Sequence, residues 1–145
     1  SFSLDPAARN PLMPGRKPFH TLNPALARLA DGRTLVYGNM GGDGQPQSQS
    51  AVFSRIVHFG MNPQAAIDAP RWLLGRTWGQ TSDTLKLEAR FPAATCDALR
   101  ALGHEVEMLK PYDETMGHAG AIVLHAHGLY EGGFDPRSDG AVASW

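Results

Sequence analysis

The sequence predicts an α+β fold, and three observations support this class. Two pairs of apolar runs are each joined by a short turn that contains glycine, Asp31-Gly32 and His127-Gly128, which is typical of β-hairpins. Between the hairpins, apolar side chains recur at helical spacing over residues 48–59. A second helical pattern, over residues 91–102, is flanked by two short alternating runs. Hairpins and helices within 145 residues indicate a single domain of the α+β class.

The chain begins with a proline-rich segment. Residues 1–18 contain four prolines and show neither a helical nor a strand period, so we expect an extended arm that lies on another surface. The first hairpin follows, with residues 21–29 and 33–38 as its expected strands. This hairpin leads the chain into a glycine-rich stretch over residues 38–49.

Two helices are expected in the middle of the chain. The first covers residues 48–59, and Gly60 ends it. Asn62 is a favourable N-cap residue and Pro63 suits the first helical position, so a short second helix is expected from there to Asp68.

Residues 69–79 have the composition of a loop, yet they include Trp72, Trp78 and two arginines. Large aromatic side chains are rarely left in solvent. We therefore expect this loop to pack against a partner surface.

The rest of the chain alternates between strand and helix patterns. Two strands flank the second helical pattern, and the second hairpin follows them. Their expected ranges are 84–88 and 105–109 for the flanking strands, 91–102 for the helix, and 119–126 and 129–134 for the hairpin.

Composition excludes several classes of function. A net charge of −1 offers no basic surface for nucleic acid, and no run of about 18 apolar residues could span a membrane. Cys96 is the single cysteine, so no internal disulfide forms, and its apolar neighbours favour a packed helix face over a reactive thiol. The histidines lack the spacing of a zinc site, so no metal site is expected.

The glycine-rich stretch is the strongest candidate for a functional site. Gly41 and Gly42 remove the side chains that would keep a ligand from the main chain, so neighbouring N–H groups can converge on an anion. Such a pair of donors is what an oxyanion hole requires. The alternative is a tight connection between a strand and a helix. The glycine offsets of phosphate-binding loops are missing.

Other polar residues are weaker candidates for a functional site. His20 and Thr21 could hold a substrate carboxylate through an N–H and a hydroxyl, or they could form local hydrogen bonds at a strand edge. Asp135 and Arg137 are expected to form a structural ion pair or to fix a turn. No serine, threonine or cysteine has an evident activating base, so we expect the chain to lack its own nucleophile.

Five segments, in their order and spacing, carry a family likeness over almost the whole chain. They are Pro14-Gly15-Arg16-Lys17-Pro18, Thr21-Leu22-Asn23-Pro24, residues 38–49, residues 62–71 and Gly132-Gly133-Phe134-Asp135-Pro136-Arg137-Ser138. Together they resemble the C-terminal part of the small subunit of gamma-glutamyltranspeptidase-family enzymes, which are N-terminal nucleophile hydrolases. Residues 40–47 read Met-Gly-Gly-Asp-Gly-Gln-Pro-Gln, and this pattern, with Asp43 after the glycine pair, looks most similar to the oxamate amidohydrolase-like branch.

The resemblance implies a four-layer αββα sandwich and a proenzyme that cuts itself into a large and a small subunit. A threonine exposed by that cut attacks an amide carbonyl. By this likeness, Gly41 and Gly42 occupy the oxyanion-hole positions, while His20 and Thr21 stand in place of a serine pair that grips the α-carboxylate of a γ-glutamyl donor. The catalytic threonine would precede Ser1, so we expect this chain to be inactive alone. No metal or organic cofactor is implied.

The expected organisation is an arm over residues 1–18 and a small-subunit portion over residues 19–145, with the large subunit as partner. Three hypotheses stay open: an enzyme acting on γ-glutamyl compounds or small amides such as oxamate, a transferase acting on glutathione, and a non-catalytic binding or scaffold module of the same fold. The enzyme-fragment hypothesis predicts exposed apolar surface around Trp72 and Trp78 and a tendency to self-associate. Nothing in the sequence chooses between a cytoplasmic and a periplasmic location.

Overall fold

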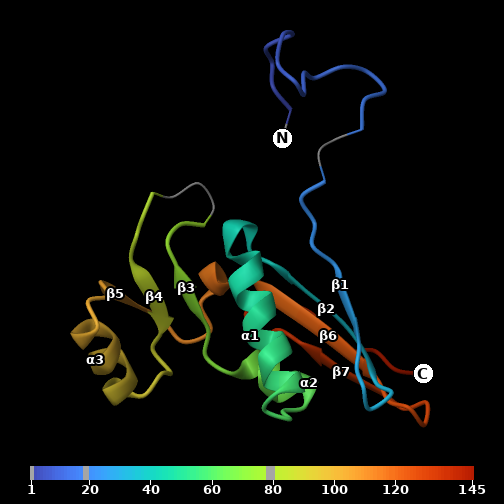
Figure 1. Ribbon diagram of the computed structural model, residues 1–145, viewed down its shortest axis with the longest axis vertical. Coiled ribbons are helices and arrows are strands. Elements are labelled where there is room, and N and C mark those ends of the chain that lie inside the picture. Colours follow the sequence, from blue (N-terminus) through green and yellow to red (C-terminus); the bar gives the residue numbers. More distant parts are fainter. Residues whose placement is uncertain (1, 18–19, 78–80) are drawn as a thin grey trace.

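The computed structural model describes residues 2–17, 20–77 and 81–145, and in that part of the chain helices pack on two β-sheets (Figure 1). The larger sheet is antiparallel, with β1 (Ala25–Arg28), β2 (Thr34–Met40), β6 (His118–Leu124) and β7 (Tyr130–Phe134) in the order β1-β2-β6-β7. The smaller sheet is β3-β4-β5, formed by β3 (Trp72–Leu74), β4 (Leu85–Glu88) and β5 (Val106–Leu109). The helices are α1 (Gln45–Val57), α2 (Pro63–Asp68) and α3 (Ala93–Ala101), with short 3₁₀ turns η1 (Gly42–Gly44) and η2 (Glu114–Met116). The expected α+β class is confirmed.

Both predicted hairpins are present. β1 pairs with β2 across the Asp31-Gly32 turn, and Gly32 has a φ of 86°, which glycine adopts without strain. β6 and β7 form the second hairpin. β2 also pairs with β6 along its whole length, as far as Met40 opposite His118.

The pairing of β2 corrects one expectation. Residues 38–40 belong to the strand instead of the loop, and α1 begins at Gln45 instead of residue 48. β6 supplies hydrogen-bonding partners for these residues from a distant part of the chain, a contribution that no local pattern reveals. The connection between β2 and α1 is therefore only Gly41 and the turn η1.

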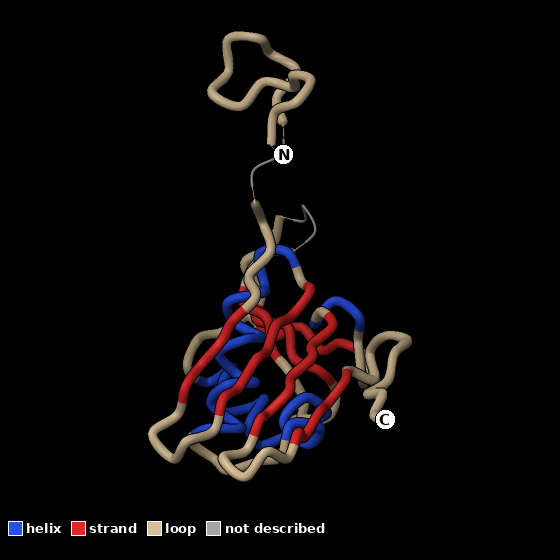
Figure 2. Tube along the Cα trace, turned by 90° about the vertical axis from the view of Figure 1, so that its right-hand side faces the viewer, coloured by secondary structure: helices blue, strands red, loops and turns tan. Residues whose placement is uncertain are grey.

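The main core lies between the larger sheet and the two helices α1 and α2. Figure 2 shows the strands of this sheet in front of these helices, which cover one face. The buried side chains of this cluster come from both layers and are Leu35, Val52, Ile56, Ala66, Ile67, Ala119, Ala121 and Val123. Burying them removes apolar surface from water and holds the helices against the sheet.

The opposite face of the larger sheet is largely uncovered. Leu26, Val36, Ile122 and Tyr130 belong to its four strands, and their exposed fractions run from 47% to 69%. A contiguous apolar face of this kind marks a contact surface more often than a free one.

The smaller sheet has its own core. β4 and β5 are parallel and are joined through α3, while Leu85, Leu87 and Cys96 pack between them. Cys96 is 4% exposed, which confirms that it lies on a packed helix face. Lys86 and Glu88 point to the other side of β4 and are also buried.

β3 corrects a second expectation, because residues 72–74 form a strand within the segment predicted to be a loop. Trp72 pairs with Leu87 and Leu74 with Leu85 across the antiparallel β3–β4 ladder. Trp72 is 38% exposed, whereas Trp78 lies outside the described residues.

Arg71, Glu88, Asp135 and Arg137 form a buried ionic cluster between the two sheets. Arg137 Nε and Nη2 each lie 2.6 Å from the Glu88 carboxylate, and Arg137 Nη1 lies 3.0 Å from Asp135 Oδ1. Asp135 Oδ2 accepts a hydrogen bond from Arg71. The expected structural pair of Asp135 and Arg137 is confirmed. The expectation that residues 69–79 face a partner is wrong for Arg71, which is fully buried within this chain.

The ionic cluster stays charged despite its burial. Desolvation lowers the pKa of Arg71 to about 10, against the attraction of Asp135. Burial also opposes ionisation of Asp135 and Glu88, but the attraction of the arginines and hydrogen bonds to both carboxylates outweigh it and hold each pKa below its ordinary value. Loss of one member would leave a buried charge without one of its partners, so the cluster ties the sheets together.

The N-terminal arm stands apart from both sheets (Figure 1). It folds back on itself: the Ser3 N–H donates to Asn10 O at 2.9 Å, and the Leu12 N–H donates to Ser3 O at 2.8 Å. Leu4, Leu12 and Met13 are exposed. Among the described helices, none is long and apolar enough to cross a membrane.

Candidate functional site

The candidate site forms where β2 ends and α1 begins. Pro46, in the first turn of α1, has no N–H to leave unpaired there. α1 packs on the sheet through Val52 and Ile56, which holds its first turn close to the end of β2. The glycine pair therefore sits in a short connection that is anchored at both ends.

The backbone of this connection explains both glycines. Gly42 has a φ of 52°, in the left-handed region that favours glycine. A Cβ on Gly41 would lie 3.2 Å from Asn39 Nδ2, which is a tight contact, and 3.6 Å from Gly117 Cα, which is an ordinary one. A larger residue at Gly41 would displace the Asn39 amide, and one at Gly42 would strain the main chain.

The peptide between Gly41 and Gly42 has a defined orientation. Gly41 O accepts a hydrogen bond from the Gly44 N–H at 2.9 Å. The carbonyl and the N–H of a trans peptide point in opposite directions, so the Gly42 N–H points away from Gly44. Within the described ranges, no hydrogen bond uses the Gly42 N–H. This N–H is therefore available to a ligand.

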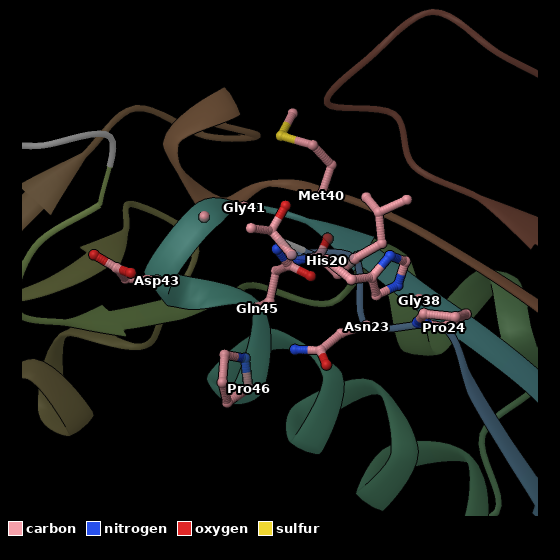
Figure 3. A pocket seen from close by; sticks show the side chains of 13 residues that line it. His20, Asn23, Pro24, Gly38, Met40, Gly41, Asp43, Gln45 and Pro46 are labelled. Atoms are coloured by element: carbon pink, nitrogen blue, oxygen red, sulfur yellow. The ribbon is translucent and has the colours of Figure 1, made fainter. Parts of the chain in front are cut away.

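A pocket of about 830 Å³ surrounds this peptide (Figure 3). Its wall comes from the segment before β1, the end of β2, η1 and the first turn of α1. The lining residues are His20, Thr21, Leu22, Asn23, Pro24, Gly38, Asn39, Met40, Gly41, Gly42, Asp43, Gln45 and Pro46. In Figure 3 the side chains of His20, Asn23 and Gln45 gather around the end of β2.

The structure brings all four sequence-predicted site residues to this pocket. His20 and Thr21 are exposed, on the segment that leads into β1, and they line the same cavity as Gly41 and Gly42. Gln49 Nε2 donates to Asn23 O at 2.9 Å and ties that segment to α1. An imidazole and a hydroxyl thus share a cavity with the Gly42 N–H.

Charge at the pocket is nearly balanced. Asp43 lies in the lining, and its carboxylate is 3.3 Å from Arg76 Nε. Both side chains are more than half exposed, so the ion pair contributes at most about 1 kcal/mol to stability. Arg76 nonetheless offsets a negative charge that would repel an anionic substrate.

Sequence reasoning missed Asn39. Its side chain is 7% exposed, its Oδ1 accepts a hydrogen bond from Arg71 Nη1 at 3.2 Å, and its Nδ2 has no hydrogen-bond partner within the described residues. Asn39 thereby connects the ionic cluster to the β2 end. Asn39 stands two residues before Gly41, and this closeness in sequence is the one feature that could have indicated its place in the site.

Gly117 is a second residue that sequence reasoning missed. It has a φ of 74°, and a Cβ there would lie 1.9 Å from Met40 O. Only glycine fits, so the chain entering β6 can pass directly against the residues before the glycine pair. Among the described residues, no group of three histidine, cysteine, aspartate or glutamate side chains is placed to hold a metal.

Comparison with known proteins matches the chain to one family along its whole length. The model of the gamma-glutamyltranspeptidase family matches residues 1–145. The oxamate amidohydrolase proenzyme of Klebsiella pneumoniae is 61% identical over 145 residues, which are 100% of this chain and 28% of that protein. The glutathione hydrolase-like YwrD proenzyme of Bacillus subtilis is 46% identical over 141 residues, which are 97% of this chain and 27% of that protein.

A solved structure is similar to almost the whole chain. The cephalosporin acylase of Bacillus halodurans superposes with a TM-score of 0.71 at 32% identity, covering 99% of this chain and 26% of that one. The chain therefore spans only about a quarter of the length of these three relatives.

Proposed function

Because this chain belongs to the gamma-glutamyltranspeptidase family, we propose that it is the C-terminal portion of the small subunit of an enzyme that cleaves or transfers the acyl group of an amide. Its fold is that of the N-terminal nucleophile hydrolases, α+β, of which this chain contributes one helix-covered sheet. In this proposal residues 19–145 form the small-subunit portion, and residues 1–18 are an arm.

The observation that carries the proposal is the orientation of the Gly42 N–H. Its own peptide is held by Gly44, it donates to nothing within the described residues, and its residue lines the pocket. A fixed donor beside a cavity can stabilise an oxyanion without having to reorganise during the reaction. Gly41, also in the lining, is the second donor that we assign to this oxyanion hole.

The proposed chemistry needs a nucleophile from outside this chain. A threonine hydroxyl at the start of the complete small subunit attacks the amide carbonyl, and its proton passes to the threonine's own α-amino group. The carbonyl oxygen becomes an oxyanion that accepts hydrogen bonds from Gly41 and Gly42. The C–N bond then breaks, the leaving amine takes the proton, and water or a second amine releases the acyl group from the threonine.

His20 and Thr21 supply the proposed contacts to a substrate carboxylate. Both line the pocket that contains the glycine pair, so a carboxylate held there lies close to the scissile carbonyl. The most similar relatives named above are an oxamate amidohydrolase and a glutathione hydrolase-like protein, and both names imply substrates that carry a carboxylate. A small amide with a carboxylate, such as oxamate, is our first candidate substrate, and a γ-glutamyl compound is the second.

The large subunit of the same proenzyme is the proposed partner. The uncovered face of the larger sheet is turned toward the viewer in Figure 2. Its exposed side chains, including Val36 and Ile122, give the large subunit an apolar surface on which to pack. The relatives are proenzymes of which this chain matches only a part, so the length needed for a second subunit exists in them. The same exposed face predicts that the isolated chain self-associates.

The first test is the composition of the purified full-length protein. Intact mass and N-terminal sequencing should find two polypeptides, the smaller beginning with threonine ahead of Ser1. Turnover of oxamate and of a glutathione analogue then selects the substrate class. A single uncut polypeptide without turnover of either would contradict the proposal and favour a binding module of the same fold.

A further inference from the structure

Thr77 contacts the glycine pair from a distant part of the chain. It follows β3, its side chain is fully buried, and its Oγ1 donates to Gly41 O at 3.0 Å. Gly75, two residues earlier, turns the chain with a φ of 82° and donates its N–H to Thr84 O at 3.0 Å. The path of the backbone before Thr77 is therefore held by the smaller sheet.

Gly41 O thus has two donors, Thr77 Oγ1 and the Gly44 N–H. The Gly44 donor belongs to the turn η1 itself and moves with the loop. Thr77 is attached to the other sheet, so it fixes the carbonyl relative to the body of the molecule. Because the peptide is planar and trans, fixing the Gly41 carbonyl also fixes the Gly42 N–H.

This restraint matters because the peptide lies between two glycines. Glycine populates positive and negative φ about equally, so a Gly–Gly peptide can rotate with little steric penalty. A rotated peptide would turn the Gly41 carbonyl oxygen toward the site of the developing oxyanion and the N–H away from it. A carbonyl dipole in that orientation repels the charge that the N–H stabilises.

We propose that Thr77 is a positioning residue that keeps the Gly42 N–H directed into the oxyanion hole. This inference rests on the proposed function, and it adds a residue that lies outside the pocket lining. Thr77 does not touch the substrate. It acts through the orientation of one peptide.

The test compares Thr77→Val, which removes only the hydroxyl's hydrogen bond, with Thr77→Ser, which keeps it. In the full-length protein we expect Thr77→Val to lower kcat by about tenfold, as expected from the loss of one hydrogen bond, with KM changed less than about twofold. Thr77→Ser should restore kcat to within about threefold of the parent. The matched control is Thr84→Val, whose hydroxyl also forms hydrogen bonds in the smaller sheet but does not contact the glycine pair.

A parallel Gly42→Val variant separates failure of this inference from failure of the proposed function. A large loss of kcat in Gly42→Val with parent kcat in Thr77→Val overturns the role of Thr77 and leaves the oxyanion hole in place. If Gly42→Val and Thr77→Val both keep the parent kcat, the proposed oxyanion hole and the role of Thr77 are both overturned. An equal loss in Thr77→Val and Thr84→Val shows a general effect of the sheet and also overturns the inference.

Two further measurements keep the test decisive. If Thr77→Val does not fold, Thr77→Cys, a weaker donor of similar size, should give a kcat below that of Thr77→Ser, and equal values overturn the inference. A high-resolution structure of the folded Thr77 variant, which requires no substrate, should show the Gly41–Gly42 peptide rotated or in two orientations. A single orientation identical to that of the parent overturns the inference.

Discussion

Replacing Gly42 with valine in the full-length protein tests the central assignment most directly. Gly42 has a φ of 52°, a conformation that costs a β-branched residue about 1–3 kcal/mol. The main chain is expected to relax out of this conformation and to carry the Gly42 N–H away from the pocket. Loss of one oxyanion-hole donor lowers turnover by about 100- to 1,000-fold, so kcat should fall by about 100-fold or more.

Gly60→Val is a matched control for the backbone strain. Gly60 has a φ of 66°, and a Cβ there would meet no atom within 4 Å. The strain of the new valine is therefore similar, about 1–3 kcal/mol, but it lies beyond the end of α1 and away from the pocket. Both variants should lose comparable stability, and only Gly42→Val should lose turnover.

The assay is kcat and KM for oxamate and for a glutathione analogue, measured beside thermal unfolding of each variant. A folded Gly42→Val protein that keeps the parent kcat would remove Gly42 from the mechanism. Similar losses of kcat in Gly42→Val and Gly60→Val would mean that strain, and not a lost donor, is responsible.

Three other predictions concern the pocket and the ionic cluster. His20→Ser should raise KM for oxamate several-fold and improve turnover of the glutathione analogue, since the family likeness places a serine at this position; steady-state kinetics with both substrates decide. Arg71→Met should lower the free energy of unfolding by about 3–5 kcal/mol in urea titrations, because it removes one of the two arginines that pair with the buried Asp135 and leaves Oδ2 of that carboxylate without a charged partner, whereas Arg33→Met, which breaks an exposed pair, should cost at most about 1 kcal/mol. The depressed pKa values of Asp135 and Glu88 stabilise the fold above the ordinary values of 3.8 and 4.5, and this contribution is lost as pH falls through the lower folded values. Unfolding free energy should therefore decline below about pH 4.5, and less steeply in Glu88→Gln.

The controls for these predictions are internal to each comparison. If Arg71→Met and Arg33→Met lower the free energy of unfolding equally, the buried cluster does not have the structural role proposed for it. An acid response of Glu88→Gln identical to that of the parent would show that other groups control the acid transition. A His20→Ser protein with the parent preference for both substrates would place His20 outside the substrate contacts.

Elements whose cause is local could be predicted from the sequence. The Asn62 side chain accepts a hydrogen bond from the Ala65 N–H at 2.7 Å, and Pro63 begins α2, as the sequence of this turn indicated. The Asp31-Gly32 hairpin and the helix that carries Cys96 were predicted for the same reason. In each case the residues that favour the element are its neighbours in sequence.

Elements that depend on a distant partner were missed. β3 has only three residues and no distinctive pattern, and it is a strand because β4 supplies its hydrogen bonds. The end of β2 was assigned to a loop because the paired strand β6 begins at His118, 78 positions after Met40. Glycine and asparagine have a low intrinsic preference for strands, which made the end of β2 look like a loop. Hydrogen bonding to β6 outweighs this low preference.

The residues of the candidate site also fall into two groups, those that the sequence indicated and those that only the structure revealed. Gly41, Gly42, His20 and Thr21 could be singled out because composition and family likeness both point to them, and they line one pocket in the structure. Their roles remain predictions. No local pattern indicated Thr77, because its contact to Gly41 joins residues 36 positions apart.

The sequence by itself determined the α+β class, the two hairpins, the helix boundaries to within a few residues and the glycine pair. Turns, caps and apolar periodicity act over a few residues, so their effects are visible along the chain. Tertiary structure alone decided that Arg71 is paired with Asp135, that Asn39 connects this pair to the end of β2 and that Thr77 holds the glycine peptide. Each of these contacts joins groups from separate segments of the chain, and only the packing of the two sheets brings them within hydrogen-bonding distance.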